Sequence, residues 1–246
     1  MNADAIHPQA WLAAHPLGPN EQLYTVFGSA SSADPWGAWC RLAGVQTAQP
    51  IWDGTPYAGW KPVMPYLARL SADSDFLGWC ADTEARDWGW LAVSSHDPDA
   101  LLAHLQSLTQ VLMPRGDRVF FRFWDGHYLL PTLDHPSPAQ EQPFGVFSRF
   151  WINGQVRNGG EAPLPAPQPF PWWRVPEALV SGLLRHDLAP VVGNLLQWLR
   201  EQHPDQYFAL PEPTLQHKVE HFVRGTVMDE HTAARLLAHL QKDLSR

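Results

Sequence analysis

The amino-acid sequence predicts an α/β (α+β) N-terminal lobe, with helices flanking a mixed sheet, and a smaller all-helical C-terminal lobe. In the first part of the chain, short runs of β-branched and aromatic residues alternate with segments of helical periodicity. That alternation favours a sheet that is at least partly parallel. Gly and Pro dominate residues 154–171, and only helical periodicity follows. We therefore expect an α/β lobe over 1–153, a linker over 154–171 and a helical lobe over 172–246.

The first strand and the first helix carry clear local signals. The segment "QLYTVFG", residues 22–28, is rich in β-branched and aromatic residues and ends at a glycine, which predicts a strand. A helix is expected directly afterwards. Asp34 is placed to cap it, Pro35 to open it and Gly44 to follow its end.

The next segments continue the alternation. Residues 62–70, "PVMPYLARL", predict an edge or irregular strand, because Pro65 cannot donate a hydrogen bond within a central ladder. A helix over 73–85 and a strand over 87–95 are expected to follow.

The strongest helical pattern begins at Asp97, which is expected to cap a helix opened by Pro98. Leucines recur at helical spacing as far as Leu112, and Pro114 is expected to stop the helix. The sequence "RGDRVFFRFWD" then predicts another strand. Beyond the linker, the periodicity predicts a helical lobe of roughly 75 residues, a size that is marginal for independent stability.

Composition excludes several classes of protein. The net charge of −8 argues against a nucleic-acid partner, whose phosphates require Lys and Arg. No apolar run approaches the roughly 20 residues needed to span a membrane, and the N-terminus lacks a signal-peptide pattern, so a cytoplasmic protein without a membrane partner is expected. There is no Gly-rich phosphate loop, and no cofactor is expected. Cys40 and Cys80 stand alone and are expected to be buried apolar residues.

One segment matches a zinc-protease pattern. In "HKVEH", His217 and His221 stand one helical turn apart, with Glu220 as a potential general base. A third ligand would have to come from the acidic residues that follow, which are Asp229, Glu230 and Asp243. A solvated helix face explains the same letters, and we favour it. Ser29 lacks the framing of a nucleophile elbow. We therefore expect no catalytic residue, no metal site and no enzymatic activity.

Surface recognition is better supported by the sequence. Aromatic residues stand between prolines and glycines in "PIWDGTPYAGWKPVMPY" and in "PFPWWRV". Trp and Tyr are among the residues that most often anchor protein interfaces. The alternative is that these rings cover the core beneath long loops. The candidate partner-binding residues are Trp52, Tyr57, Trp60, Trp172 and Trp173.

The segment "VFFRFWDGHYLL", residues 119–130, places two charges among aromatic side chains. In an extended strand Arg122 would face the same way as Phe120 and Trp124, where its guanidinium could stack on their rings and reach a carboxylate. Asp125 fits either an Asp-Gly hairpin turn or the N-cap of a short helix, and we favour the N-cap.

Several stretches together resemble the domain of unknown function 4123 family, over about residues 20 to 150. "FRFWDGHYLLPTL" resembles its signature segment, and Gly126 stands where a proline is common. The order and spacing of further stretches also fit. These are "LYTVFGSA", "WDGTPYAGWKPVMPYLARL", "DWGWLAVSS", "LLAHLQSLTQV" and "PFGVF".

The resemblance implies an adaptor chaperone of bacterial type VI secretion. Such a protein binds a toxic effector in the cytoplasm and promotes its loading onto the valine-glycine-repeat spike protein, which it contacts directly or through the effector. The signature residues Arg122, Phe123, Trp124 and Asp125 are then expected to be structural. The alternatives are an immunity protein that inhibits a toxin and, less favoured, a zinc hydrolase that uses "HKVEH".

Overall fold

The computed structural model describes residues 5–136, 142–160, 162–164, 170–186, 188–226 and 231–244. The chain divides into two compact units, Met1–Leu179 (unit 1) and Val180–Arg246 (unit 2). The fold class is as predicted: unit 1 contains a sheet flanked by helices, and unit 2 is helical in its described residues.

The main sheet of unit 1 has six strands in the order β2-β3-β1-β4-β7-β8. Every strand pairing in this sheet is antiparallel, so the expectation of a mixed sheet is wrong. The reason lies in the connections. β3 and β4 lie on opposite sides of β1, so the helix between them joins strands that are not neighbours. The strands are β1 (Gln22–Gly28), β2 (Ala48–Pro50), β3 (Pro65–Leu70), β4 (Gly89–Ser94), β7 (Arg149–Ile152) and β8 (Gln155–Asn158).

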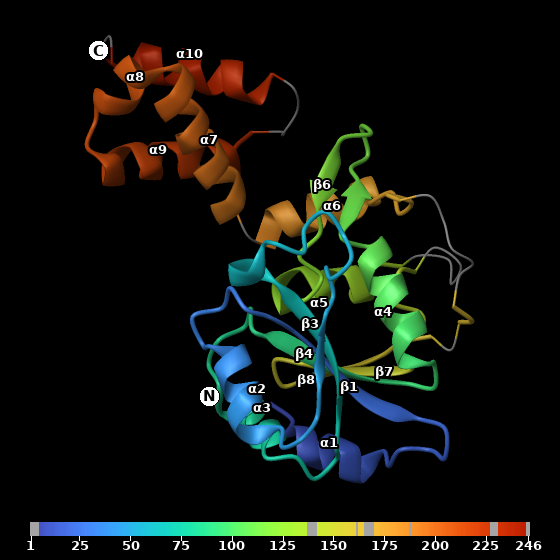
Figure 1. Ribbon diagram of the computed structural model, residues 1–246. Coiled ribbons are helices and arrows are strands. Elements are labelled where there is room, and N and C mark those ends of the chain that lie inside the picture. The colour runs from blue at the N-terminus through green and yellow to red at the C-terminus, as the bar shows by residue number, and fades with distance from the viewer. Residues whose placement is uncertain are drawn as a thin grey trace. The chain divides into compact units, whose positions relative to one another are not determined.

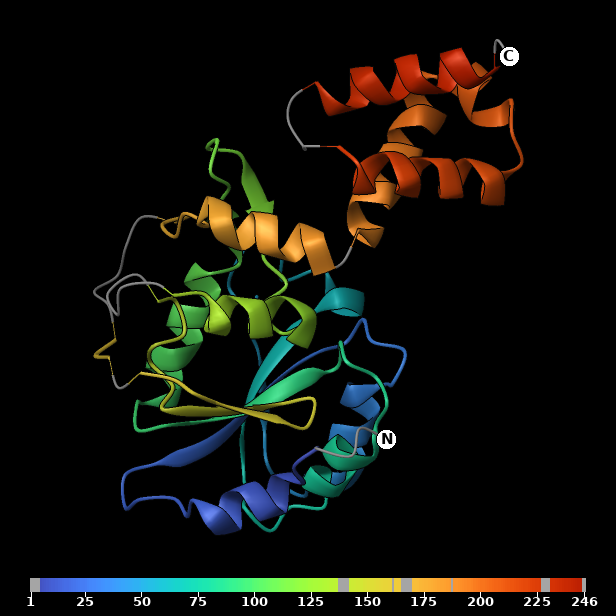
Figure 2. The same cartoon turned by 180° about the vertical axis from the view of Figure 1, so that it is seen from behind.

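Helices cover both faces of this sheet, as Figure 1 shows. On one face lie α1 (Pro8–Ala14), α2 (Pro35–Leu42) and α3 (Phe76–Asp82). Their buried residues pack with Leu23 and Phe27 of β1 in one apolar cluster. Seen from behind in Figure 2, α4 (Pro98–Ser107) and α5 (Gly126–Asp134) lie on the other face. Because both faces are covered, β1 is buried from Leu23 to Gly28.

Several sequence predictions are confirmed and others are corrected. β1 has the predicted bounds, and the Asp34 side chain accepts a hydrogen bond from the Gly37 N–H at the start of α2. β3 is not an edge strand, because β2 pairs outside it and Pro65 stands at its first position, opposite Gly28. Cys80 is buried as expected, but Cys40 is exposed.

The helix that begins at Pro98 is shorter than predicted. α4 ends at Ser107, and β5 (Gln110–Leu112) follows it. β5 pairs with β6 (Arg118–Phe120) in a second, two-stranded sheet. Val111, which is β-branched, is buried in this hairpin and stands opposite Val119, so tertiary pairing overrides the leucine periodicity.

Part of the expected linker is a strand. β8 pairs with β7 through a two-residue turn in which Asn153 and Gly154 both have positive φ, 52° and 80°. Asn-Gly is the preferred sequence for such a turn, and "RFWINGQVRN" carries that signal. The N-terminal segment closes on this hairpin, since the Ile6 N–H donates to the Gly154 carbonyl at 2.9 Å. The expectation of an extended connector over 154–171 is therefore wrong for Gln155–Asn158.

Unit 2 has its own apolar core. Leu199 on α7 packs with Leu215 and Val219 on α9 and with Leu236 on α10. These positions follow the helical periodicity that the sequence predicts. Among the described residues of both units, no helix combines the length and apolar character that crossing a membrane requires. The helices are α6 (Glu177–His186), which begins in unit 1, α7 (Ala189–Gln202), α8 (Pro204–Phe208), α9 (Glu212–Arg224) and α10 (Thr232–Leu244).

Candidate functional site

The signature segment (residues 121–133) leaves the small sheet and enters the core of unit 1. β6 ends at Phe120, so the residues that follow do not continue the strand, contrary to the extended reading of Arg122. The Phe123 and Trp124 side chains are buried. The Phe123 carbonyl accepts a hydrogen bond of 2.8 Å from the indole N–H of the buried Trp90 on β4. This segment is therefore anchored to the central sheet.

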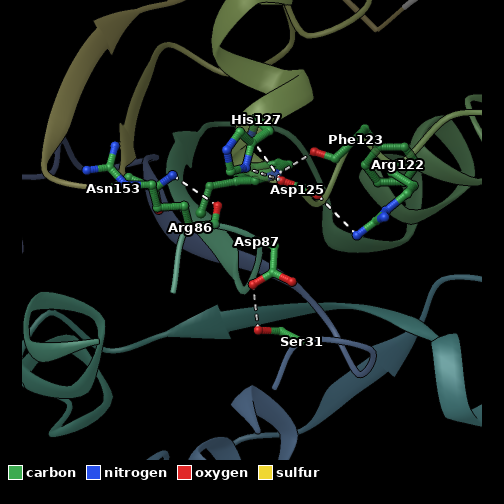
Figure 3. Close-up of polar contacts among 9 residues, drawn as sticks. Ser31, Arg86, Asp87, Arg122, Phe123, Asp125, His127 and Asn153 are labelled. Atoms are coloured by element: carbon green, nitrogen blue, oxygen red, sulfur yellow. Dashed lines mark hydrogen bonds and ion pairs between the residues drawn. The ribbon is translucent and has the colours of Figure 1, made fainter. Parts of the chain in front are cut away.

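Asp125 caps α5, as predicted. Its carboxylate accepts a hydrogen bond of 2.9 Å from the His127 backbone N–H and lies 3.1 Å from the Arg122 guanidinium (Figure 3). The Arg122 guanidinium also lies 5.8 Å from the centre of the Tyr128 ring. The carboxylate that Arg122 was expected to reach is therefore that of Asp125. The ring beside its guanidinium is that of Tyr128, and not Phe120 or Trp124 as expected.

The two side chains of the Arg122–Asp125 ion pair differ in solvent exposure. Asp125 is buried, whereas 47% of the Arg122 side chain is exposed. Burial raises the pKa of the Asp125 carboxyl above its ordinary value of 3.8, against the opposing effects of the His127 N–H and the Arg122 charge. The arrangement orders the start of α5.

Gly126 opens α5 in a crowded place. A Cβ atom there would lie 2.5 Å from the Asn153 Nδ2 atom and 2.9 Å from the Ile152 Cγ2 atom. The Asn153 amide in turn donates to the Arg86 carbonyl at 3.0 Å (Figure 3). This packing against the β7–β8 turn explains why a glycine stands at this position.

We expect Asp125→Ala to lower the free energy of unfolding of unit 1 by about 2 kcal/mol, because α5 loses its cap and Arg122 its partner. Asp125→Asn keeps an acceptor for the His127 N–H and should cost less than about 1 kcal/mol at pH 7. Urea unfolding followed by Trp fluorescence measures both variants.

Comparing wild type with Asp125→Asn at different pH values tests the raised pKa of Asp125. Because the folded-state pKa of Asp125 is raised, its contribution to stability is fully present below the unfolded pKa and is lost as pH rises through the folded value. Wild type should therefore gain stability relative to Asp125→Asn as the pH is lowered from 7 to below the ordinary value of 3.8. A difference that shrinks toward acid would contradict this assignment.

Three of the candidate partner-binding residues come together with Phe120 of β6 and Trp124 of the signature segment. We call Trp52, Tyr57, Trp60, Phe120 and Trp124 the ring cluster. The Phe120 ring centre lies 4.9 Å from that of Tyr57 and 5.3 Å from that of Trp60, and Trp52 lies 5.5 Å from Trp124.

The ring cluster has an exposed top and a buried base. The Trp60 and Phe120 side chains are 48% and 40% exposed, whereas Trp52 is only 2% exposed. Trp52 therefore supports the surface from below and offers no outer contact, which corrects its expected role. Val63, three residues after Trp60, and Val119, directly before Phe120, are also exposed. Sequence reasoning missed Phe120, although its alternation with the buried Phe121 was a usable signal.

Trp172 and Trp173 do not belong to this surface. Trp173 is 6% exposed and its ring lies 5.4 Å from that of Phe121, so it is a core residue and not a surface contact as expected. The Trp172 indole N–H donates to the Ser107 hydroxyl at 2.9 Å, and its ring lies 6.2 Å from His104. These two residues were expected to begin the helical lobe, but they lie in unit 1, where they tie the chain to α4 and β5.

The histidines of the zinc-protease pattern do not come together with a third ligand in the described parts of the chain. His217 and His221 are exposed on α9, on either side of the buried Val219, and no group of three metal-ligating side chains occurs in the described parts of the chain. Asp243 pairs with Lys218 at 2.6 Å, and Asp229 and Glu230 lie outside the described residues. A cavity of about 710 Å³ beside β1 and β3 has mixed polar and apolar walls, and its Glu21 is already paired with Arg149 at 2.9 Å.

The fold and the ring cluster define an α/β domain that displays aromatic side chains on its surface. Residues 23–142 match the family model of the Domain of unknown function (DUF4123). The resemblance inferred from the sequence is thereby confirmed. The family is known generally as one of adaptors and chaperones for type VI secretion effectors. No curated protein and no solved structure matches the chain.

Proposed function

We propose that this protein is a non-enzymatic adaptor chaperone that binds one type VI secretion effector in the cytoplasm and promotes its loading onto the valine-glycine-repeat spike protein. The observation that carries the proposal is the ring cluster, whose exposed rings all lie inside the family-matched residues 23–142. Exposed Trp, Tyr and Phe side chains that share one contact network are typical of the centre of a protein interface.

The division of labour within the cluster supports a binding role. Trp124 joins the cluster to the signature segment, which Trp90 fixes to the central sheet. The exposed rings therefore stand on a base that is already ordered before a partner arrives. A preordered surface loses less side-chain entropy on binding, and this strengthens the complex.

Capture of the effector tests the proposal. Tagged protein is expected to retain the toxin encoded beside its own gene, and the toxin should leave the cell by type VI secretion only when the adaptor is present. Trp60→Ala should weaken capture roughly tenfold or more, as expected for an exposed interface anchor. Phe208→Ala is the matched control, because Phe208 is an exposed ring in unit 2 and outside the cluster.

Two results would contradict the proposal. Rescue of growth by this protein alone, with the toxin's activity blocked in the purified complex, would make it an immunity protein. Turnover of a substrate by the purified chain would make it an enzyme.

A further inference from the structure

The outer edge of β6 presents backbone groups that have no hydrogen-bond partner among the described residues. β5 and β6 are antiparallel, with Val111 opposite Val119. The Phe121 N–H donates to the Thr109 carbonyl at 3.0 Å. In such a ladder, hydrogen-bonded residues alternate with residues whose N–H and C=O point away from the partner strand. Val119 therefore bonds to β5, and the backbone groups of Arg118 and Phe120 point outward.

The opposite edge of this small sheet confirms the alternation. Leu112 on β5 stands opposite Arg118 and turns its own backbone groups away from β6. Those groups are used, since the Leu112 N–H donates to the Trp173 carbonyl at 2.9 Å and the Val175 N–H donates to the Leu112 carbonyl at 2.8 Å. β5 thus has a backbone neighbour on each side. β6 is the outer strand, and all three of its residues are exposed.

The side chains beside this edge favour an apolar ligand. Phe120 belongs to both β6 and the ring cluster. A residue directly opposite Phe120 on an added strand would point to the same face, with its Cβ atom about 5 Å from that of Phe120. An apolar side chain at that position would contact the Phe120 ring and reach toward Trp60 and Tyr57. Figure 1 shows β6 in a hairpin that stands apart from the six-stranded sheet of unit 1.

The charges around the edge differ in sign from those of the whole chain. Lys61, Arg115 and Arg118 are exposed, and none forms an ion pair within the described residues. The exposed carboxylates nearest along the chain are Asp53 and Asp117. This local excess of cations, in a chain of net charge −8, complements a ligand that carries carboxylates.

We propose that the outer edge of β6 binds an extended segment of the partner polypeptide as an added β-strand. The segment places an apolar side chain against Phe120 and Trp60 and flanking carboxylates near Arg118 and Lys61. Main-chain hydrogen bonds to Arg118 and Phe120 supply affinity, and the alternating side chains supply specificity. The identity of that polypeptide as an effector rests on the proposed function, but the strand-addition site itself does not.

A displayed library of random 10-residue peptides is the probe. Selection on the wild-type protein is expected to enrich peptides with alternating apolar residues flanked by Asp or Glu. Arg118→Pro removes an outward N–H while leaving the Val119 bonds to β5, and proline is tolerated on an edge strand. It should weaken the enriched peptides roughly tenfold, whereas Arg118→Ala, which keeps the N–H, should weaken them roughly threefold.

Two results would overturn the strand-addition proposal, and a third would reject only the adaptor function. No enrichment, or equal affinity for Arg118→Pro and Arg118→Ala in variants that melt like wild type, would exclude strand addition. Wild-type protein that sediments as a dimer, with a monomeric Arg118→Pro variant, would assign the edge to a second copy of the chain. Peptides that bind at β6 when no toxin is retained by the full chain would leave the edge assigned and reject the adaptor function.

Discussion

Trp90→Ala is expected to lower the free energy of unfolding of unit 1 by about 3–5 kcal/mol. The Trp90 side chain is fully buried on β4, and its ring centre lies 5.4 Å from that of Phe147 and 5.7 Å from that of Phe150. Truncation leaves a cavity among these rings. It also leaves the Phe123 carbonyl without its indole donor, so the signature segment loses its tie to the sheet.

Urea unfolding followed by Trp fluorescence measures this effect, because every Trp except Trp198 lies in unit 1. Trp90→Phe is the matched variant. It keeps most of the ring volume, loses the hydrogen bond to the Phe123 carbonyl and should cost about 1–3 kcal/mol. If Trp90→Ala unfolded at the same urea concentration as the exposed-ring variant Trp60→Ala, the ring packing around Trp90 would be wrong.

Val219→Asp is expected to unfold unit 2 at room temperature. Val219 is fully buried in the core of this unit, and an unpaired carboxylate there costs several kcal/mol, a large fraction of the stability of a unit this small. Loss of helical circular dichroism, with the Trp fluorescence of unit 1 largely retained, is the expected result.

The neighbouring residues of "HKVEH" provide the control. His217→Ala and His221→Ala change exposed side chains on the same helix and should alter stability by less than about 0.5 kcal/mol. The contrast tests whether this motif is a solvated helix face with one core residue. Stoichiometric zinc in the purified protein, lost in His217→Ala, would contradict that interpretation and restore the hydrolase alternative.

Local signals in the sequence predicted local structure well. The caps at Asp34, Asp97 and Asp125 are all confirmed, because each depends on a short polar side chain within three residues of the N–H that it accepts from. The direction of the strands was predicted wrongly, since no pair in the main sheet is parallel. It depends on which strands become neighbours, and the placing of β3 and β4 on opposite sides of β1 is not encoded in any short window.

The ring cluster also could not be predicted from a short stretch of sequence. Tyr57 and Trp60 were expected to bind a partner because they stand among prolines and glycines, yet nothing in their own segment indicates Phe120. Only the packing of the β5–β6 hairpin brings that ring 4.9 Å from Tyr57. Burial of Trp173 was equally hidden, since its contact with Phe121 joins residues distant in the chain. Whether Tyr57 and Trp60 bind a partner stays a prediction.

The pairing of β7 with β4 has a practical consequence for the expression of shorter fragments of the protein. A truncated fragment ending at residue 142, where the family match stops, would lack Phe147 and Phe150 beside Trp90 and would leave one side of β4 bare. An uncovered central strand invites aggregation. The piece of chain that completes the central sheet is thus longer than the stretch that matches the family model.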